Sequence, residues 1–314
     1  MIKYPPIEGH PVLQSYTTKM RKIRVYNGGA AGLTQFQVCV EIGGDFTEKA
    51  DVNHLKFMQG DEELYYWVEE WKRPSGKARI WIKVPNLPAG STETIYLYYG
   101  GRLSSNRHDG DQVFEFFDDF DGSSLDTSKW TVNAYASYSI QNSWLTLATS
   151  ADNNWANIKS EYVLNSERIA RCRFKGNYGF TGHPFFVHAT ASSNRVAVSD
   201  YGYTGEEIGT QYAEDGTWSY PHAFDTFTKG RLLIAEITRK TSTSFRVSLK
   251  GVDGTDFGSD ERTYSGWSSL DFSIQTATEK IDQTFHWDFV AVRKYAETEP
   301  DVTLGEEENY FKIW

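Results

Sequence analysis

The sequence predicts an all-β protein made of two antiparallel β-sandwiches, the second of them a large jelly roll. Apolar residues alternate with polar ones in short runs, turns containing glycine separate these runs, and aromatic residues make up 15% of the chain. This balance favours strands and turns, and no stretch between residues 113 and 300 shows the 3.6-residue period of a sustained helix. At 314 residues the chain is long for one sandwich and sufficient for two.

The first predicted sandwich runs from residue 19 to about residue 105. Along Gln35–Ile42 every second residue is apolar, which is the period of two that a half-buried strand requires. The same alternation recurs at Ile80–Val84 and Ile95–Tyr99, with glycine or proline turns between the runs. Short strands at regular spacing are typical of a sandwich. The proline-containing residues 1–18 predict an extended N-terminal arm.

The second predicted sandwich covers residues 113–303 and follows a polar linker at residues 106–112. Alternating runs resume there, and about ten or more strands suit a jelly roll. Charge supports the division, because residues 1–105 carry 13 Lys and Arg against 11 Asp and Glu, whereas residues 106–314 carry 19 against 31. The last residues, 304–314, are acidic and then aromatic, which predicts a docking tail.

The composition argues against several classes of protein. A formal net charge of −10 disfavours nucleic acid as the main partner, because phosphate binding needs clustered positive charge. No window approaches the ~18 apolar residues of a membrane span, so we expect no membrane insertion. Cys39 and Cys172 lie in alternating runs of different predicted domains, which indicates two buried free thiols.

The opening residues Met1–Pro6 lack the charged and apolar regions of a signal peptide. Two explanations stay open: a signal has been removed, or the protein reaches a virion by assembly. The expected location is therefore extracellular, at a cell surface or on a virion.

Three aromatic blocks carry a resemblance in the first domain. They are Leu64–Trp71, Ile80–Pro85 and Ile95–Gly100. Together they resemble DUF2341, a domain of unknown function in bacterial, archaeal and viral surface proteins. This resemblance implies a surface protein and assigns no site.

The two ends of the second domain carry another resemblance. Phe116–Gly122 with Lys129-Trp130, and Trp287–Tyr295 near the end, resemble the opening and closing strands of concanavalin-A-like, laminin-G-like sandwiches. That group includes lectins and family-16 glycoside hydrolases. The resemblance implies the fold and a bias towards sugar binding, but no particular ligand.

Catalysis lacks its usual signature. Glycoside hydrolysis needs two carboxylates that flank the scissile bond. Family-16 enzymes place theirs on one strand face as Glu-x-Asp-x-x-Glu, a string that is absent here. The nearest acidic pairs, Glu206-Glu207 and Glu214-Asp215, are neighbours that would point to opposite faces of a strand. We therefore predict that the protein is not an enzyme. A hydrolase whose carboxylates come from distant positions is the alternative.

Asp288 is the leading candidate metal ligand. It matches the position at which related sandwiches hold a structural Ca²⁺. Asp119 or Asp121 would add a carboxylate, since Ca²⁺ takes several oxygen ligands. A structural Ca²⁺ is therefore the one cofactor predicted. The alternative is that these aspartates cap turns and pair with Arg293 or Lys294.

His183 and His188 are five positions apart. On one regular strand they would face opposite sides, so we expect no shared metal. No nucleophile elbow, phosphate loop, Cys-x-x-Cys pair or His-Glu-x-x-His string occurs either.

Aromatic residues in polar surroundings carry the remaining functional signal. Sugar rings stack their C–H faces on flat side chains, while polar neighbours bind the hydroxyl groups. A stretch at residues 201–224 combines aromatic residues with Gly, Asp and Glu, and one more tryptophan follows two asparagines. The alternative is that such rings fill the open ends of a sandwich. The candidate sugar-binding residues are Tyr201, Tyr203, Tyr212, Trp218, Tyr220 and Trp155.

These observations predict a non-catalytic surface or virion-associated protein with a carbohydrate-binding or adhesive role. Its expected partner is a polysaccharide or cell-surface glycan. The second hypothesis is a structural assembly subunit, a homo-oligomer or larger assembly joined through its terminal arms.

Overall fold

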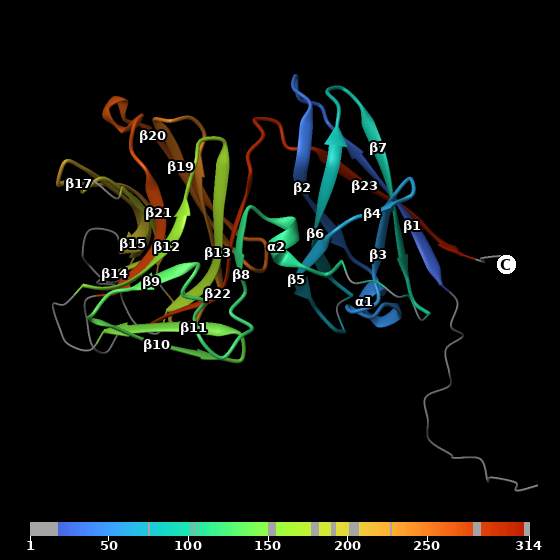
Figure 1. Cartoon of the computed structure of the whole chain (residues 1–314), viewed down its shortest axis with the longest axis horizontal. Coiled ribbons are helices and arrows are strands. Elements are labelled where there is room, and N and C mark those ends of the chain that lie inside the picture. Colours follow the sequence, from blue (N-terminus) through green and yellow to red (C-terminus); the bar gives the residue numbers. More distant parts are fainter. Residues whose placement is uncertain are drawn as a thin grey trace, which may run out of the picture. The chain divides into compact units, whose positions relative to one another are not determined.

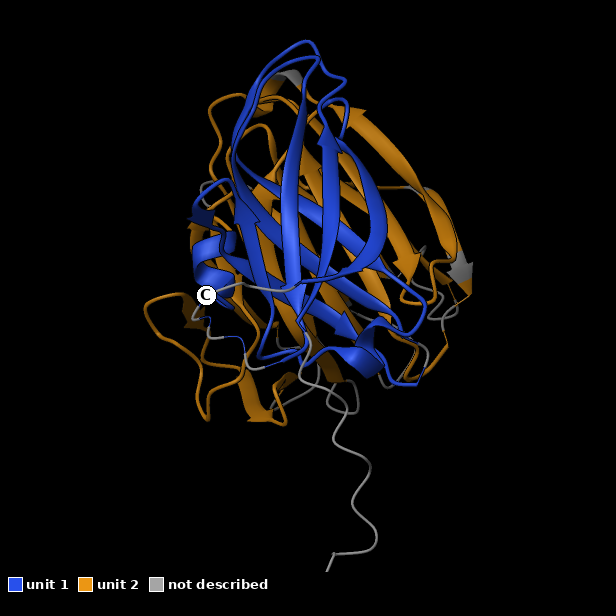
Figure 2. Cartoon of the chain, turned by 90° about the vertical axis from the view of Figure 1, so that its right-hand side faces the viewer, with its two compact units in different colours: residues 1–113, 297–314 blue, residues 114–296 orange. Residues whose placement is uncertain are grey.

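The computed structural model describes residues 18–74, 76–101, 103, 105, 107–149, 155–176, 182–189, 193–200, 207–226, 228–278 and 284–310. The chain divides into two compact units (Figure 2). Unit 1 comprises residues 1–113 and 297–314, and unit 2 comprises residues 114–296. Antiparallel strands dominate both units, which confirms the all-β class. Within the described residues, no helix is long and apolar enough to cross a membrane.

The described residues of unit 1 form two antiparallel sheets and two one-turn helices, α1 (Phe46–Lys49) and α2 (Gly110–Val113) (Figure 1). The five-stranded sheet has the order β23 (Asp301–Asn309), β1 (Lys19–Tyr26), β7 (Thr92–Tyr99), β3 (Lys56–Gln59), β4 (Glu62–Glu63). The three-stranded sheet has the order β2 (Leu33–Ile42), β6 (Ala78–Leu87), β5 (Tyr66–Trp71). Alternate apolar residues of both sheets are fully buried, as the period of two requires.

The C-terminal segment is part of unit 1. Strand β23 pairs antiparallel with β1, from Tyr26 opposite Asp301 to Lys19 opposite Asn309. The prediction of a docking tail at residues 304–314 is therefore wrong for the described part of that segment. The expected N-terminal arm at residues 1–18 lies outside the described residues, except for its last residue.

The segment expected to be a linker also belongs to unit 1. The Tyr66 amide donates to the Arg107 carbonyl, and the Asp109 amide donates to the Tyr66 carbonyl. Helix α2 follows directly, and its Val113 is fully buried. The first unit thus reaches Val113 rather than about residue 105, because strand-like pairing with β5 continues through the polar residues.

Unit 2 is a two-sheet jelly roll. One sheet has the order β10 (Ala136–Gln141), β11 (Trp144–Thr149), β22 (Thr284–Lys294), β13 (Arg168–Gly176), β18 (Leu233–Arg239), β19 (Ser244–Gly251), β20 (Asp256–Thr263), with β8 (Phe116–Asp118) also paired to β22. The seven-stranded sheet has the order β17 (Thr217–Thr226), β16 (Glu207–Glu214), β15 (Arg195–Asp200), β14 (Gly182–Ala189), β21 (Phe272–Thr278), β12 (Ala156–Val163), β9 (Trp130–Val132). A short 3-10 turn, Ser265–Trp267, precedes β21.

One hydrophobic core fills the space between these two sheets. It takes alternate residues from both, such as Cys172 and Val290 from the first and Val187 and Ile274 from the second. Trp287 is central: it is fully buried, and its Nε1–H donates to the Pro184 carbonyl at 2.7 Å. Removing these apolar side chains from water is the main driving force that holds the two sheets together.

Glu307 joins β23 to the rest of unit 1. Its carboxylate accepts a hydrogen bond from the Tyr99 hydroxyl at 2.5 Å and from Lys49 Nζ at 3.1 Å. Lys19 Nζ lies 3.5 Å from the same carboxylate. Burial raises the pKa of Glu307, but these hydrogen bonds and charges outweigh it, and the net result is a pKa below the ordinary 4.5.

We predict that Glu307→Gln lowers the free energy of unfolding by about 1 kcal/mol at pH 7, because the hydrogen bonds and ion pairs lose their charged acceptor. The pKa of Glu307 is lower in the folded protein than its ordinary 4.5. The stabilisation is therefore complete above about pH 4.5 and is lost as pH falls through the folded pKa. Urea denaturation at pH 7 and pH 3.5 should show the difference between the two proteins shrinking at the lower pH. Glu308→Gln, at an exposed neighbouring position, is the control.

Candidate functional site

The outer face of the seven-stranded sheet, the face turned away from the core, carries the candidate site. In β15, Val196 and Val198 point into the core, so Arg195 and Ala197 point outwards. Arg195 lies opposite His188 of β14 and opposite Ala213 of β16, and Ala213 lies opposite Trp218 of β17. Side chains from several strands thus meet on one surface.

Five side chains on this surface form a contiguous group that we call the aromatic cluster: Trp155, His183, Phe186, Arg195 and Trp218. The Arg195 guanidinium carbon lies 4.7 Å from the Trp155 ring centre and 4.8 Å from that of Trp218. It also lies 4.9 Å from the Phe186 ring centre. A cation over an aromatic face is attracted to the ring's negative π-surface, so Arg195 holds three rings in fixed orientations.

His183 completes the cluster. Its ring lies 5.2 Å from the Trp155 ring and stacks 6.3 Å from the Trp218 ring. The side chain is buried, and no described residue offers its Nδ1 a hydrogen bond. Burial lowers the pKa of His183 well below 6.5, and the nearby charges of Arg195 and His188 lower it further. His183 is therefore neutral at physiological pH.

Amide groups lie beside the cluster on the same face. Gln211 Nε2 donates to the Tyr220 hydroxyl at 2.9 Å, and Asn157 Nδ2 donates to Gln275 Oε1 at 2.7 Å. Gln211 Oε1 is buried and accepts no hydrogen bond from any described residue. The surface therefore combines flat apolar rings with groups that donate and accept hydrogen bonds.

The structure places the predicted sugar-binding residues in different environments. Trp218 is 39% exposed, and Trp155 and Tyr220 are partly exposed on the same face. Tyr212 was expected to bind sugar, but it is 1% exposed in the core and its hydroxyl donates to the Asp260 carbonyl. It alternates with the outward-facing Gln211 and Ala213 on β16, so it must point inwards. Tyr201 and Tyr203 lie outside the described residues.

Arg195, His183 and Phe186 were missed by sequence reasoning. His183 and His188 were expected on opposite faces, but the register of β14 shifts between His183 and Phe186. This irregularity brings both histidines to the outer face. Arg195 gave no signal of its own, because nothing in the sequence shows which aromatic residues surround it.

The predicted metal ligands do not meet in the described structure. Asp288 accepts a hydrogen bond from Arg173 and forms an ion pair with it. Across the described ranges, no three His, Cys, Asp or Glu side chains group closely enough to hold a metal ion. Asp119 and Asp121 therefore do not join Asp288 in such a group, and the structural Ca²⁺ stays a prediction.

Residues 51–133 match the family described as "Domain of unknown function (DUF2341)". This match confirms the first resemblance and extends it past the end of unit 1 at Val113. It covers about a quarter of the chain. No curated protein matches the chain.

The chain is similar to several solved structures. One comes from the endo-acting O-glycanases that human gut microbiota express to initiate mucin breakdown (12% identity, TM-score 0.47, 58% of this chain and 100% of that one). Another is an immunostimulatory antigen and pseudo beta-1,3-glucanase of Mycobacterium tuberculosis (16%, 0.46, 58% and 99%). A third is the endo-beta-1,3-glucanase of Pyrococcus furiosus (13%, 0.44, 58% and 94%).

These structures bear on one earlier prediction. We expected a protein that is not an enzyme, and this prediction is contradicted: the similar structures include glycosyl hydrolase family proteins and glucanases. The Glu-x-Asp-x-x-Glu string is only one way to bring two carboxylates together. Carboxylates from separate strands can also meet in one site, so the absence of this string does not exclude catalysis.

We predict that His183 makes the folded protein less stable in mild acid. Because its pKa is lowered in the folded protein, the unfolded chain binds a proton first as pH falls below 6.5. The contribution of His183 to stability is therefore complete above about pH 6.5. It falls at up to about 1.4 kcal/mol per pH unit below that value.

The measurement is urea denaturation at pH 7.5, 6.0 and 5.0 for the wild type and His183→Asn. The variant should lose less stability between pH 7.5 and 5.0 than the wild type does. His222→Asn, at an exposed histidine of β17, is the control. Parallel pH curves for wild type and His183→Asn would contradict the prediction.

Proposed function

We propose that unit 2 binds a carbohydrate chain on the outer face of its seven-stranded sheet. The observation that supports this most directly is the pair of indole rings, Trp155 and Trp218, held in place by Arg195 between them. A pyranose ring presents a flat patch of C–H groups, and an aromatic ring of fixed orientation binds it with little loss of side-chain freedom.

The polar groups beside the cluster suit the same ligand. Sugar hydroxyls donate and accept hydrogen bonds, and Gln211, Tyr220 and Asn157 offer both functions along one face. Trp218 has the largest exposed area of these rings and stands at the edge strand β17. The ligand would therefore extend across the strands from Trp218 towards Trp155. An extracellular, cell-surface or virion location and an assembly role remain predictions.

Trp218→Ala should weaken polysaccharide binding about tenfold, a loss of ~1.4 kcal/mol that is typical of one stacking contact. The measurement is retention of the full chain on immobilised microbial and plant polysaccharides, with Ca²⁺ present and with it chelated. Released oligosaccharides are scored in the same incubations. Release would show that the bound chain is also cleaved.

Tyr138→Ala is the matched control for Trp218→Ala. Tyr138 is 40% exposed, nearly the same as Trp218, but it lies on β10 of the other sheet. Equal retention of both variants and the wild type would overturn the proposed site. Retention that is lost equally in both variants would point to non-specific adhesion of exposed rings.

A further inference from the structure

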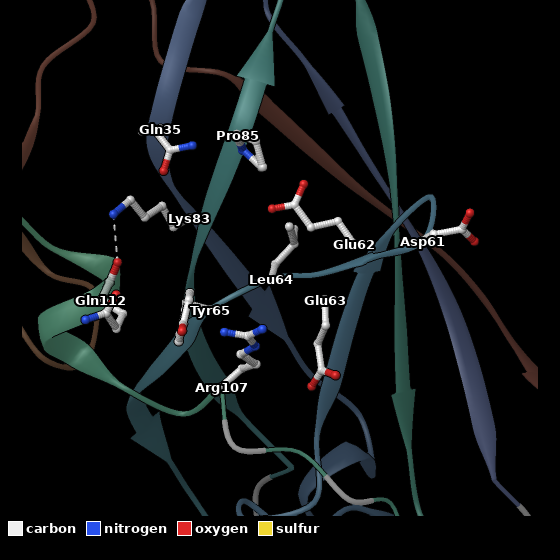
Figure 3. Close-up of a pocket in the computed structure, with 10 residues that line it drawn as sticks. All are labelled: Gln35, Asp61, Glu62, Glu63, Leu64, Tyr65, Lys83, Pro85, Arg107 and Gln112. Atoms are coloured by element: carbon white, nitrogen blue, oxygen red, sulfur yellow. Dashed lines mark hydrogen bonds between the residues drawn. The ribbon is translucent and has the colours of Figure 1, made fainter.

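Unit 1 contains a cleft of about 490 Å³ that the proposed function does not use (Figure 3). One wall comes from the turn between β3 and β4, and the other from β2, β6 and α2. The described residues that line it are Gln35, Asp61, Glu62, Glu63, Leu64, Tyr65, Lys83, Pro85, Arg107 and Gln112. This volume lies within the range of small-molecule sites and suits one or two sugar rings.

Some of the lining groups are held in place by neighbours. The Arg107 guanidinium carbon lies 4.4 Å from the Tyr65 ring centre. Lys83 Nζ donates to the Gln112 carbonyl at 2.8 Å. Glu63 forms an ion pair with Lys56 at 2.9 Å. These contacts fix the walls of the cleft before any ligand arrives.

Two polar side chains point into the same space without such contacts. The Gln35 amide and the Glu62 carboxylate both face the space beside Pro85 (Figure 3). Neither side chain has a hydrogen bond or ion pair with another described residue. Gln35 has a φ of 48°, in the left-handed region that a non-glycine residue rarely adopts. It lies beside Pro85, which has no amide N–H to continue the ladder of β2 and β6.

The cleft carries both signs of charge, so neither an anion nor a cation meets a uniformly favourable lining. Asp61, Glu62 and Glu63 would repel an anion, and Lys83 and Arg107 would repel a cation. A neutral polyol meets neither penalty. Its hydroxyls can donate to the Glu62 carboxylate and accept from the Gln35 amide or the Arg107 guanidinium.

The floor of the cleft fits the apolar side of the same ligand. Pro85 and the Tyr65 ring are partly exposed and present apolar surface, with the buried Leu64 behind them. Sugars combine a hydroxylated rim with a C–H face, and a mixed lining of this kind matches both. We infer that unit 1 has a saccharide-binding cleft of its own, which takes one or two rings of a neutral sugar.

The test uses the full chain carrying Trp218→Ala, so that the proposed site of unit 2 is already weakened. Cellobiose, maltose, laminaribiose and N,N′-diacetylchitobiose are each added at millimolar concentration, and saturation-transfer difference NMR detects binding. At least one disaccharide should give a signal. Because the ligand is neutral, the affinity should stay within about twofold between 50 and 500 mM NaCl.

Glu62→Ala and Gln35→Ala should each reduce that signal at least fivefold. Both residues are exposed, so circular dichroism should show an unchanged fold. Glu48→Ala, at an exposed glutamate of α1, is the matched control and should leave the signal unchanged. Glu62 and Gln35 lie in unit 1, so a loss of signal in these two variants reports on the cleft whether or not unit 2 binds polysaccharide.

Three outcomes would overturn the inference. The first is no saturation transfer with any of the four disaccharides. The second is transfer that Glu62→Ala and Gln35→Ala leave unchanged. The third is binding of tetralysine, lost in Glu62→Ala and at high salt, with no binding of a disaccharide, which would make the cleft a site for basic peptides.

Discussion

The alternation of side chains along each strand is the constraint on which unit 2 depends. A strand that buries every second residue in the core must present the others on the opposite face. In β16 this rule places Tyr212 inside and Gln211 outside, and in β15 it places Val196 inside and Arg195 outside. The core that joins the sheets and the surface that carries the aromatic cluster are therefore two faces of the same strands.

Unit 1 depends instead on the pairing of two strands that lie far apart in the sequence, β1 and β23. Its edge strand β23 follows unit 2 in the chain, so its five-stranded sheet is complete only after the chain has passed through the whole of unit 2. Glu307 links β23 to the rest of unit 1, because its carboxylate contacts Tyr99, Lys49 and Lys19 from separate parts of that unit. Contacts of such sequence separation form late and slowly. Glu307, in the segment that was expected to be a docking tail, is thus structural.

The two candidate sites use different chemistry. The aromatic cluster is apolar, with one guanidinium stacked between rings, whereas the cleft of unit 1 is polar and lined by both signs of charge. Ring stacking tolerates many sugars, while a small cleft with converging polar groups discriminates among them.

The sequence by itself determined the all-β class, the core strands and the DUF2341 segment, because alternation and turn residues are local signals. It also identified Trp218, Tyr220 and Trp155 as ring-bearing residues in polar surroundings. Only the tertiary structure decided that Tyr212 is buried, that a register shift turns His183 outwards and that Arg195 lies among three rings. Strand order and register bring these residues together from distant positions, and neither is encoded within any short window of sequence.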